Sequence, residues 1–143
     1  MWRSGDPRSG RNSTTVRKRG RMAENMYSKL MVAMQTPVAR VILANPPVNV
    51  IYMPMMEELM AAINEVERRD DIVAVVFGGS DRAFSAGVDI ASHMPETIGE
   101  MLRKFHAVIR ALMTMKKVTI AVVRGTCLGG GAELAAVCDL VFT

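Results

Sequence analysis

Two aliphatic runs with a helical pattern between them limit the folds open to this chain more than any other feature. Ile72–Phe77 and Val118–Val123 consist mainly of Val, Ile and Ala. Between them, Pro95–Met115 repeats apolar residues at the three- and four-residue spacing of a helix. Strands separated by a helix pair in parallel through a right-handed crossover, and such strands are commonly buried on both faces. The pattern therefore predicts an α/β fold in which both runs are buried on two faces.

The rest of the chain after residue 29 continues this alternation. The segments Gly78–Asp81 and Ala83–Ile90 are rich in small residues, and we expect both to be loops. A strand at the very end of the sequence would leave a buried element without cover, so we expect the sequence to be part of a longer protein. The remaining expected elements are two strands at Leu30–Met34 and Val38–Leu43, a helix at Met53–Arg69, a glycine-rich turn at Gly125–Gly131, a short helix at Ala132–Val137 and a strand at Leu140–Phe142.

The charge of the chain is concentrated at one end. Residues 1–21 hold seven Lys/Arg and one Asp, whereas the other 122 residues hold eleven basic and thirteen acidic side chains. Residues 1–21 also lack an apolar face, so we expect this basic leader to be disordered. Three interpretations stay open for it: an arm that binds nucleic-acid phosphates, a targeting peptide, or sequence upstream of a true start at Met22. We favour the last, because composition changes abruptly there and residues 22–143 carry all the expected elements.

Composition excludes several classes of protein. Half of the residues are hydrophobic and 22% are charged, which is typical of a globular domain rather than a disordered chain. Two cysteines, Cys127 and Cys138, make no disulfide framework, so we expect free thiols in a reducing, cytoplasmic compartment. Charged residues interrupt the longest apolar stretch, which argues against a membrane span. His93, expected in a loop, and His106, expected on a helix face, lack metal-ligand spacing, so we expect no metal site.

Each aliphatic run leads into a segment with the features of a ligand-binding loop. The first segment reads AFSAGVDI from residue 83, and the second reads GTCLGGGAEL from residue 125. Ligands of open α/β sheets bind beyond the carboxyl ends of the strands, and consecutive glycines let the backbone approach a ligand closely. One N–H group from each segment would form a two-donor oxyanion hole suited to a thioester carbonyl. Glu133, in the first turn of the expected helix, could exchange a proton beside that carbonyl.

These two motifs, which start about 40 residues apart, resemble those of the enoyl-CoA hydratase/isomerase, or crotonase, superfamily. The resemblance runs from about Val38 to Thr143, the amino-terminal half of that fold. It implies a spiral of ββα units, assembly as a trimer or a pair of trimers, and a CoA thioester as substrate with no further cofactor. Within the superfamily, SAGVDIASHM and CLGGGAELAAVCDL are most similar to hydratases of cyclic dienoyl-CoA.

The resemblance also implies roles for individual residues. The N–H groups of Val88 and Gly130 would bind the thioester oxygen, and Glu133 matches one of the two carboxylates with which hydratases activate and deliver water. A second acid, about 20 residues further on in family hydratases, would lie beyond Thr143. Asp139 cannot replace it, because six helical positions place it off the face of Glu133. The positions implied to bind substrate are Ser85, Ala86 (through its backbone), Gly87, Asp89 and Gly129.

Other functions and plainer roles stay open at this point. An enoyl-CoA isomerase or a thioester hydrolase would use the same hole with different carboxylates. A non-catalytic protein of this fold would bind a CoA ester or a partner subunit, and the basic leader would add RNA binding. Asp89 is also expected to cap the turn after Ile90, and Glu133 could be only a solvated acid at a helix start.

Overall fold

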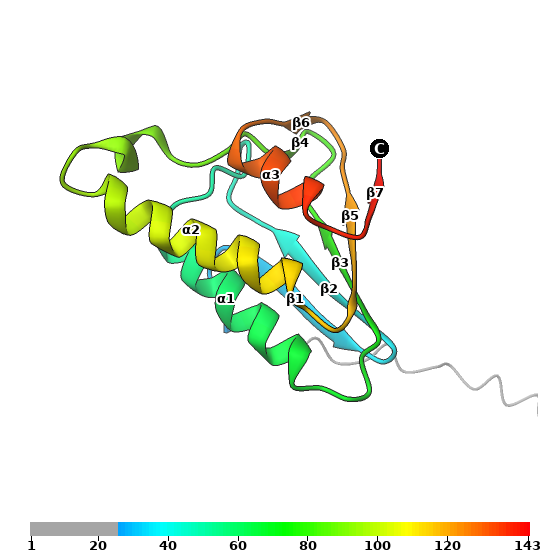
Figure 1. The fold of residues 1–143 in the computed structure, drawn as a ribbon. Helices are drawn as coiled ribbons and strands as arrows, with labels where there is room; N and C mark the ends of the chain where they lie inside the picture. Colours follow the sequence, from blue (N-terminus) through cyan, green and yellow to red (C-terminus); the bar gives the residue numbers. More distant parts are fainter. Residues whose placement is uncertain (1–25) are drawn as a thin grey trace, which may run out of the picture.

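The computed structural model describes residues 26–143, apart from the side chains of residues 92 and 93, so the expectations for the basic leader lie outside the described residues. Strands and helices alternate along this part of the chain (Figure 1). In order, the elements are β1 (Leu30–Gln35), β2 (Val38–Leu43), α1 (Met53–Glu67), β3 (Ala74–Gly78), β4 (Ala83–Ser85), the 3-10 turn η1 (Ile90–His93), α2 (Ile98–Met113), β5 (Val118–Val122), β6 (Thr126–Cys127), α3 (Gly130–Ala136) and β7 (Leu140–Phe142).

The main sheet has five strands in the order β1-β2-β3-β5-β7. Strands β1 and β2 form an antiparallel hairpin, and every other neighbouring pair is parallel. Helices α1, α2 and α3 supply the crossovers that parallel pairing requires. The α/β fold predicted from the two aliphatic runs is therefore confirmed.

One face of this sheet is covered and the other is not. Val41, Phe77 and Ala121 are in register across three parallel strands and are fully buried. Helices α1 and α2 lie side by side over this face (Figure 1). On the opposite face, Val76 and Ile120 are only half-buried. The prediction that both aliphatic runs are buried on two faces is thus wrong for the described residues, because their helices cover one face.

Helices α1 and α2 supply most of the core on the covered face. Apolar residues recur every three or four positions in both helices, as the sequence predicts. Lys104 of α2 pairs with Glu57 of α1 and with Glu100 of its own helix, which ties the exposed edges together. The buried helical side chains are Met55, Met56, Leu59, Ala62, Ile63 and Val66 in α1, and Met101, Phe105, Val108 and Leu112 in α2.

Two short strands were not expected. Strands β4 and β6 pair in parallel as a second small sheet beside the ends of β3 and β5. The sequence predicts loops there, because three and two residues are too few to show an alternating pattern. Helix α3 likewise begins at Gly130, two residues before the expected start. None of the helices in the described part of the chain is long and apolar enough to cross a membrane.

Candidate active site

The segment after β4 is bound along its length by residues 48–51. The Ile51 N–H donates to the Gly87 carbonyl at 2.8 Å, and the Asp89 N–H donates to the Ile51 carbonyl at 2.9 Å. Ile51 and Val88 therefore form a parallel bridge. In such a bridge the residue between the two bonded positions directs its own N–H to the other side. The Val88 N–H consequently points away from residues 48–51.

The glycine-rich turn ends in the first turn of α3. Gly129 caps the helix with a φ of 49°, in the left-handed region that favours glycine. The N–H groups of the three residues after Gly130 donate back to the carbonyls of Leu128 and Gly129 at 2.9–3.3 Å. The Gly130 N–H is not part of this set. Within residues 26–143, no hydrogen-bond acceptor is recorded for the N–H of Val88 or of Gly130.

These two segments approach each other closely at the unpaired N–H groups. A Cβ atom added at Gly87 would lie 3.6 Å from the backbone nitrogen of Gly130. A Cβ atom at Gly130 would lie 2.5 Å from Val88 Cγ2, and one at Gly131 would lie 2.6 Å from Ser85 Cβ. Side chains at these positions would separate the segments, so the glycines permit the approach. The two unpaired donors therefore lie on adjacent segments of the backbone.

Glu133 lies one turn after Gly130 in the same helix. It is the acidic residue of the first turn of α3, where the helix dipole favours a negative charge. Its side chain is exposed and, in the described part of the chain, forms no hydrogen bond or ion pair. Three helical positions correspond to a rise of about 4.5 Å, so Glu133 and Gly130 lie on the same side of α3 within one turn.

The other sequence-predicted residues also gather at these segments, but several already have protein partners. Ser85 is fully buried, and its hydroxyl contacts the backbone of two other residues. The Ala86 N–H donates to the Val48 carbonyl at 2.8 Å, which leaves its carbonyl for any ligand contact. The Asp89 carboxylate accepts from the Ala91 N–H at 3.2 Å, which confirms its predicted capping of the following turn.

Asn49 is a residue of this site that sequence reasoning missed. It is 3% exposed, has a φ of 52°, and its side chain donates to the carbonyls of Ala83 and Phe84 at 2.9 and 3.1 Å. An asparagine between Val48 and Val50, just after two prolines, was the available signal. Asparagine is one of the few residues that adopt a left-handed conformation readily, and here the fold also buries it.

The thiols and imidazoles add no second reactive site among the described residues. Burial raises the pKa of Cys127, and burial raises the pKa of Cys138 to about 11, so both thiols are protonated at neutral pH. Neither cysteine is in a disulfide, although Cys127 is only half-buried. His106 is exposed on α2 as predicted, whereas His93 ends the η1 turn rather than lying in a loop. No cluster of metal-ligating groups occurs among the side chains that the structure describes.

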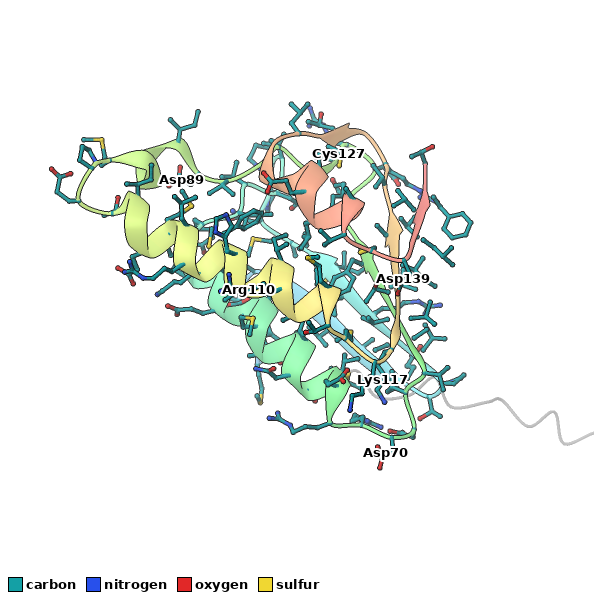
Figure 2. The ribbon with its side chains drawn as sticks, viewed as in Figure 1. Asp70, Asp89, Arg110, Lys117, Cys127 and Asp139 are labelled. Atoms are coloured by element: carbon teal, nitrogen blue, oxygen red, sulfur yellow. The ribbon has the colours of Figure 1, made fainter. Side chains whose placement is uncertain are left out.

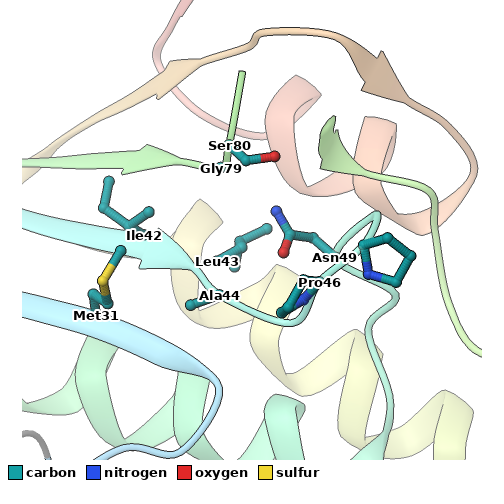
Figure 3. Close-up of a pocket in the computed structure, with 9 residues that line it drawn as sticks. Met31, Ile42, Leu43, Ala44, Pro46, Asn49, Gly79 and Ser80 are labelled. Atoms are coloured by element: carbon teal, nitrogen blue, oxygen red, sulfur yellow. The ribbon is translucent and has the colours of Figure 1, made fainter. Parts of the chain in front are cut away.

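A small pocket of about 160 Å³ opens near this site, beside the loop that follows β2 (Figure 3). It contains none of the sequence-predicted site residues. Apart from Asn49 and Ser80 its lining is apolar, and no titratable side chain reaches it, so it offers no acid–base chemistry. Its lining residues are Met31, Ile42, Leu43, Ala44, Pro46, Pro47, Asn49, Gly79 and Ser80.

Comparison with known proteins places this geometry in a family. Residues 33–143 match the enoyl-CoA hydratase/isomerase family. The chain is 31% identical over 103 residues to a cyclohexa-1,5-dienecarbonyl-CoA hydratase from Thauera aromatica, a match that covers 72% of this chain and 40% of that protein. It is 33% identical over 117 residues to a probable enoyl-CoA hydratase, echA8, from Mycobacterium tuberculosis, covering 80% of this chain and 46% of that protein.

Solved structures agree with the sequence matches. The chain superposes on DspI of Pseudomonas aeruginosa with a TM-score of 0.77 and 31% identity, covering 83% of this chain and 50% of that one. The chain thus spans about half the length, or less, of the relatives it matches. The matched residues include both segments with unpaired N–H groups and the helix that carries Glu133. The chain belongs to the enoyl-CoA hydratase/isomerase family and has the crotonase fold.

Proposed function

We propose that the N–H groups of Val88 and Gly130 bind the carbonyl oxygen of a CoA thioester. The observation that carries this proposal is the pair of unpaired donors on two segments in direct contact. Gly130 is buried and Val88 is half-buried, so an external acceptor would pair two N–H groups that are at least partly shielded from water. A thioester oxygen gains negative charge when an enolate forms, and two fixed donors stabilise that charge.

Glu133 is proposed as the general acid/base of the reaction. Its unpaired carboxylate on the first turn of α3 can exchange a proton with water or with the carbon next to the carbonyl. With the second carboxylate that family hydratases carry, this chemistry adds water across the double bond of an enoyl-CoA. The similarity to the Thauera aromatica protein makes a cyclic dienoyl-CoA a candidate beside linear substrates. The protein is further proposed to assemble into trimers. CoA is proposed to enter only as part of the substrate.

The test is to mix the 143-residue chain with crotonyl-CoA labelled with ¹³C at the thioester carbonyl. Two donors on the oxygen should lower the stretching frequency of the bound carbonyl in the infrared spectrum. Loss of the ultraviolet absorbance of the enoyl thioester would report hydration in the same sample, and free CoA serves as the control for binding through the nucleotide. Binding with an unshifted carbonyl, or no binding, would contradict the proposed hole.

The ultraviolet measurement of hydration distinguishes two functions, a hydratase and a protein that only binds CoA esters. A shifted carbonyl together with hydration supports a hydratase. A shifted carbonyl without hydration supports a protein segment that binds CoA esters but lacks catalysis. Repeating the measurement with a cyclic dienoyl-CoA then compares the two substrate classes.

A further inference from the structure

We infer that Asn49 is a positioning residue that, together with Ser85, sets the direction of the Val88 N–H. This inference rests on the proposed function, because it gives the Val88 N–H the role of a thioester donor. Asn49 itself contacts no reacting atom in this account. It acts through the peptide that precedes Val88.

Every polar group of Asn49 has a protein partner. Its Oδ1 accepts from the Asn45 N–H at 2.9 Å, and its own N–H donates to the Asn45 carbonyl at 2.8 Å. Its Nδ2 donates to two consecutive carbonyls of β4, those of Ala83 and Phe84. The side chain therefore fixes the loop after β2 and attaches this loop to β4. A buried amide with all of its groups satisfied is rigid, because any rotation would leave a donor or an acceptor unpaired.

Ser85 extends this network toward the unpaired donor. Its hydroxyl donates to the Asn49 carbonyl at 2.7 Å and accepts from the Gly87 N–H at 3.1 Å. Gly87 has a φ of 106°, a conformation that L side chains rarely adopt, so the backbone needs such contacts to stay there. One hydroxyl thus connects the buried Asn49 with the residue before Val88.

The direction of the Val88 N–H follows from the peptide plane. In a trans peptide the carbonyl and the N–H point in opposite directions. The carbonyl of the Gly87–Val88 peptide accepts from Ile51, two residues after Asn49, at 2.8 Å. Fixing that carbonyl toward residues 48–51 directs the Val88 N–H away from them. The loop that Asn49 rigidifies therefore determines where this donor points.

Two substitutions test the inference without adding bulk. Asn49→Gly keeps the left-handed backbone and removes the side chain, and Ser85→Ala removes only the hydroxyl. Asn49→Asp retains the Oδ1 acceptor and removes both Nδ2 donors, so it serves if Asn49→Gly does not fold. Thr119→Val is the matched control, because it removes a buried hydroxyl from a hydrogen-bond pair with Asp139 at the start of β5. Circular dichroism and the unfolding midpoint confirm that each variant is folded.

The first measurement needs no ligand. The one-bond residual dipolar coupling of the Val88 amide in the 143-residue chain reports the direction of its N–H. We expect this coupling to change in Ser85→Ala and in the folded Asn49 variant, and to stay at the wild-type value in Thr119→Val. An unchanged coupling in the folded Asn49 and Ser85 variants would overturn the inference, whether or not the chain binds a thioester.

The second measurement uses ¹³C-labelled crotonyl-CoA. The positioning role predicts that the Asn49 and Ser85 variants lose most of the infrared carbonyl shift and bind roughly three- to tenfold more weakly, the effect of losing one hydrogen bond. Thr119→Val should retain both the shift and the affinity. A wild-type chain without any shift would contradict the proposed thioester site alone, and the dipolar coupling would still decide the role of Asn49. A full shift in the folded Asn49 and Ser85 variants would overturn that role.

Discussion

Two polar networks, each centred on a buried side chain, differ in what they leave unpaired. At the loop cluster, which comprises residues 48–51, 83–89 and 128–131, Asn49 and Ser85 are fully paired but the nearby Val88 and Gly130 N–H groups are not. At the turn into β7, Thr119 and Asp139 exchange three hydrogen bonds at 2.8–2.9 Å. Figure 2 labels Asp89 in the first region and Asp139 in the second.

This difference distinguishes hydrogen bonds that only stabilise the fold from hydrogen bonds that also shape a candidate binding site. The pair of Thr119 and Asp139 satisfies its own groups and joins the end of α3 to β5, which is all that stability requires. The loop cluster has hydrogen bonds of similar length but leaves the N–H groups of buried Gly130 and half-buried Val88 without a protein acceptor, and the buried one carries a cost in folding free energy. Natural proteins tolerate such costs mainly at functional sites. The comparison predicts that changes at the loop cluster affect ligand binding, whereas changes at the Thr119–Asp139 pair affect stability alone.

The largest effect is expected from Gly131→Ala. The added methyl group would lie 2.6 Å from Ser85 Cβ and 2.7 Å from the Ser85 carbonyl oxygen, so α3 must move away from the loop cluster. We expect a loss of about 3 kcal/mol in the free energy of unfolding, measured by urea titration. Gly99→Ala is the control, because its methyl group meets only Arg103 Nη1 at 3.5 Å and should be neutral or slightly stabilising. If both substitutions changed the free energy of unfolding equally, close packing against Ser85 would not be the reason that position 131 holds a glycine.

The second prediction concerns Glu133→Gln in a form of the protein that hydrates an enoyl-CoA. The amide cannot exchange a proton, so turnover should fall by about 10²-fold, equivalent to roughly 2.7 kcal/mol in the activation barrier. Binding of the thioester and its carbonyl shift should stay nearly unchanged, because the two N–H donors are intact. Asp139→Asn, at the second network, should leave turnover unchanged at temperatures where the protein is folded. Unchanged turnover in Glu133→Gln would exclude Glu133 from the mechanism.

The sequence predicted those parts of the fold that depend on repeated patterns. Helices α1 and α2 were expected to within about three residues at each end, because several apolar positions in each follow the helical period. The parallel order of β3 and β5 followed from the helix between them. The second small sheet was missed, because β4 and β6 are stabilised by pairing with each other across about 40 residues rather than by any local pattern.

The residues of the candidate site also differ in whether a local sequence pattern points to them. Val88, Gly130 and Glu133 stay predictions, because they came from two glycine-containing motifs, the start of a helix and the resemblance to a family, all of which one sequence can show. Asn49 was missed, because its role depends on carbonyls 34 and 35 residues away. Ser85 was expected to contact substrate, but the fold buries its hydroxyl between Asn49 and Gly87. Long-range hydrogen bonds of this kind have no local signal, so only the folded structure reveals them.

The third prediction tests the Thr119–Asp139 pair directly. Thr119→Val keeps the shape of the side chain and leaves the Asp139 N–H without its acceptor. Since Thr119 is 1% exposed, we expect the free energy of unfolding to fall by about 1–2 kcal/mol in urea titration. The affinity for crotonyl-CoA and the carbonyl shift should not change. A loss of the carbonyl shift would contradict this difference between the two networks, because it would link the Thr119–Asp139 pair to thioester binding.

The smallest predicted effect depends on pH and concerns the start of the described chain. The Glu58 carboxylate accepts hydrogen bonds from the Ser28 hydroxyl at 2.7 Å and from the backbone N–H groups of Ser28 and Lys29, both at 2.9 Å. Burial alone would raise the pKa of Glu58, but these hydrogen bonds outweigh burial and leave the pKa below its ordinary value. A carboxylate with a lowered pKa in the folded state stabilises the protein above its unfolded-state pKa of about 4.3, and this contribution disappears as pH falls through the folded-state value.

Glu58→Gln should therefore lower the free energy of unfolding by about 1 kcal/mol at pH 7 and by progressively less below about pH 4. Glu57→Gln is the matched control on the adjacent helical position. Its carboxylate pairs with Lys104 at the surface, so its removal should cost only a few tenths of a kcal/mol. Neither substitution should change the carbonyl shift of bound crotonyl-CoA, because both lie outside the loop cluster. The free energy of unfolding of Glu58→Gln could also differ from that of wild type by a constant amount from pH 7 to pH 3. That result would show that the effect of Glu58 comes from the shape of its side chain rather than from its charge.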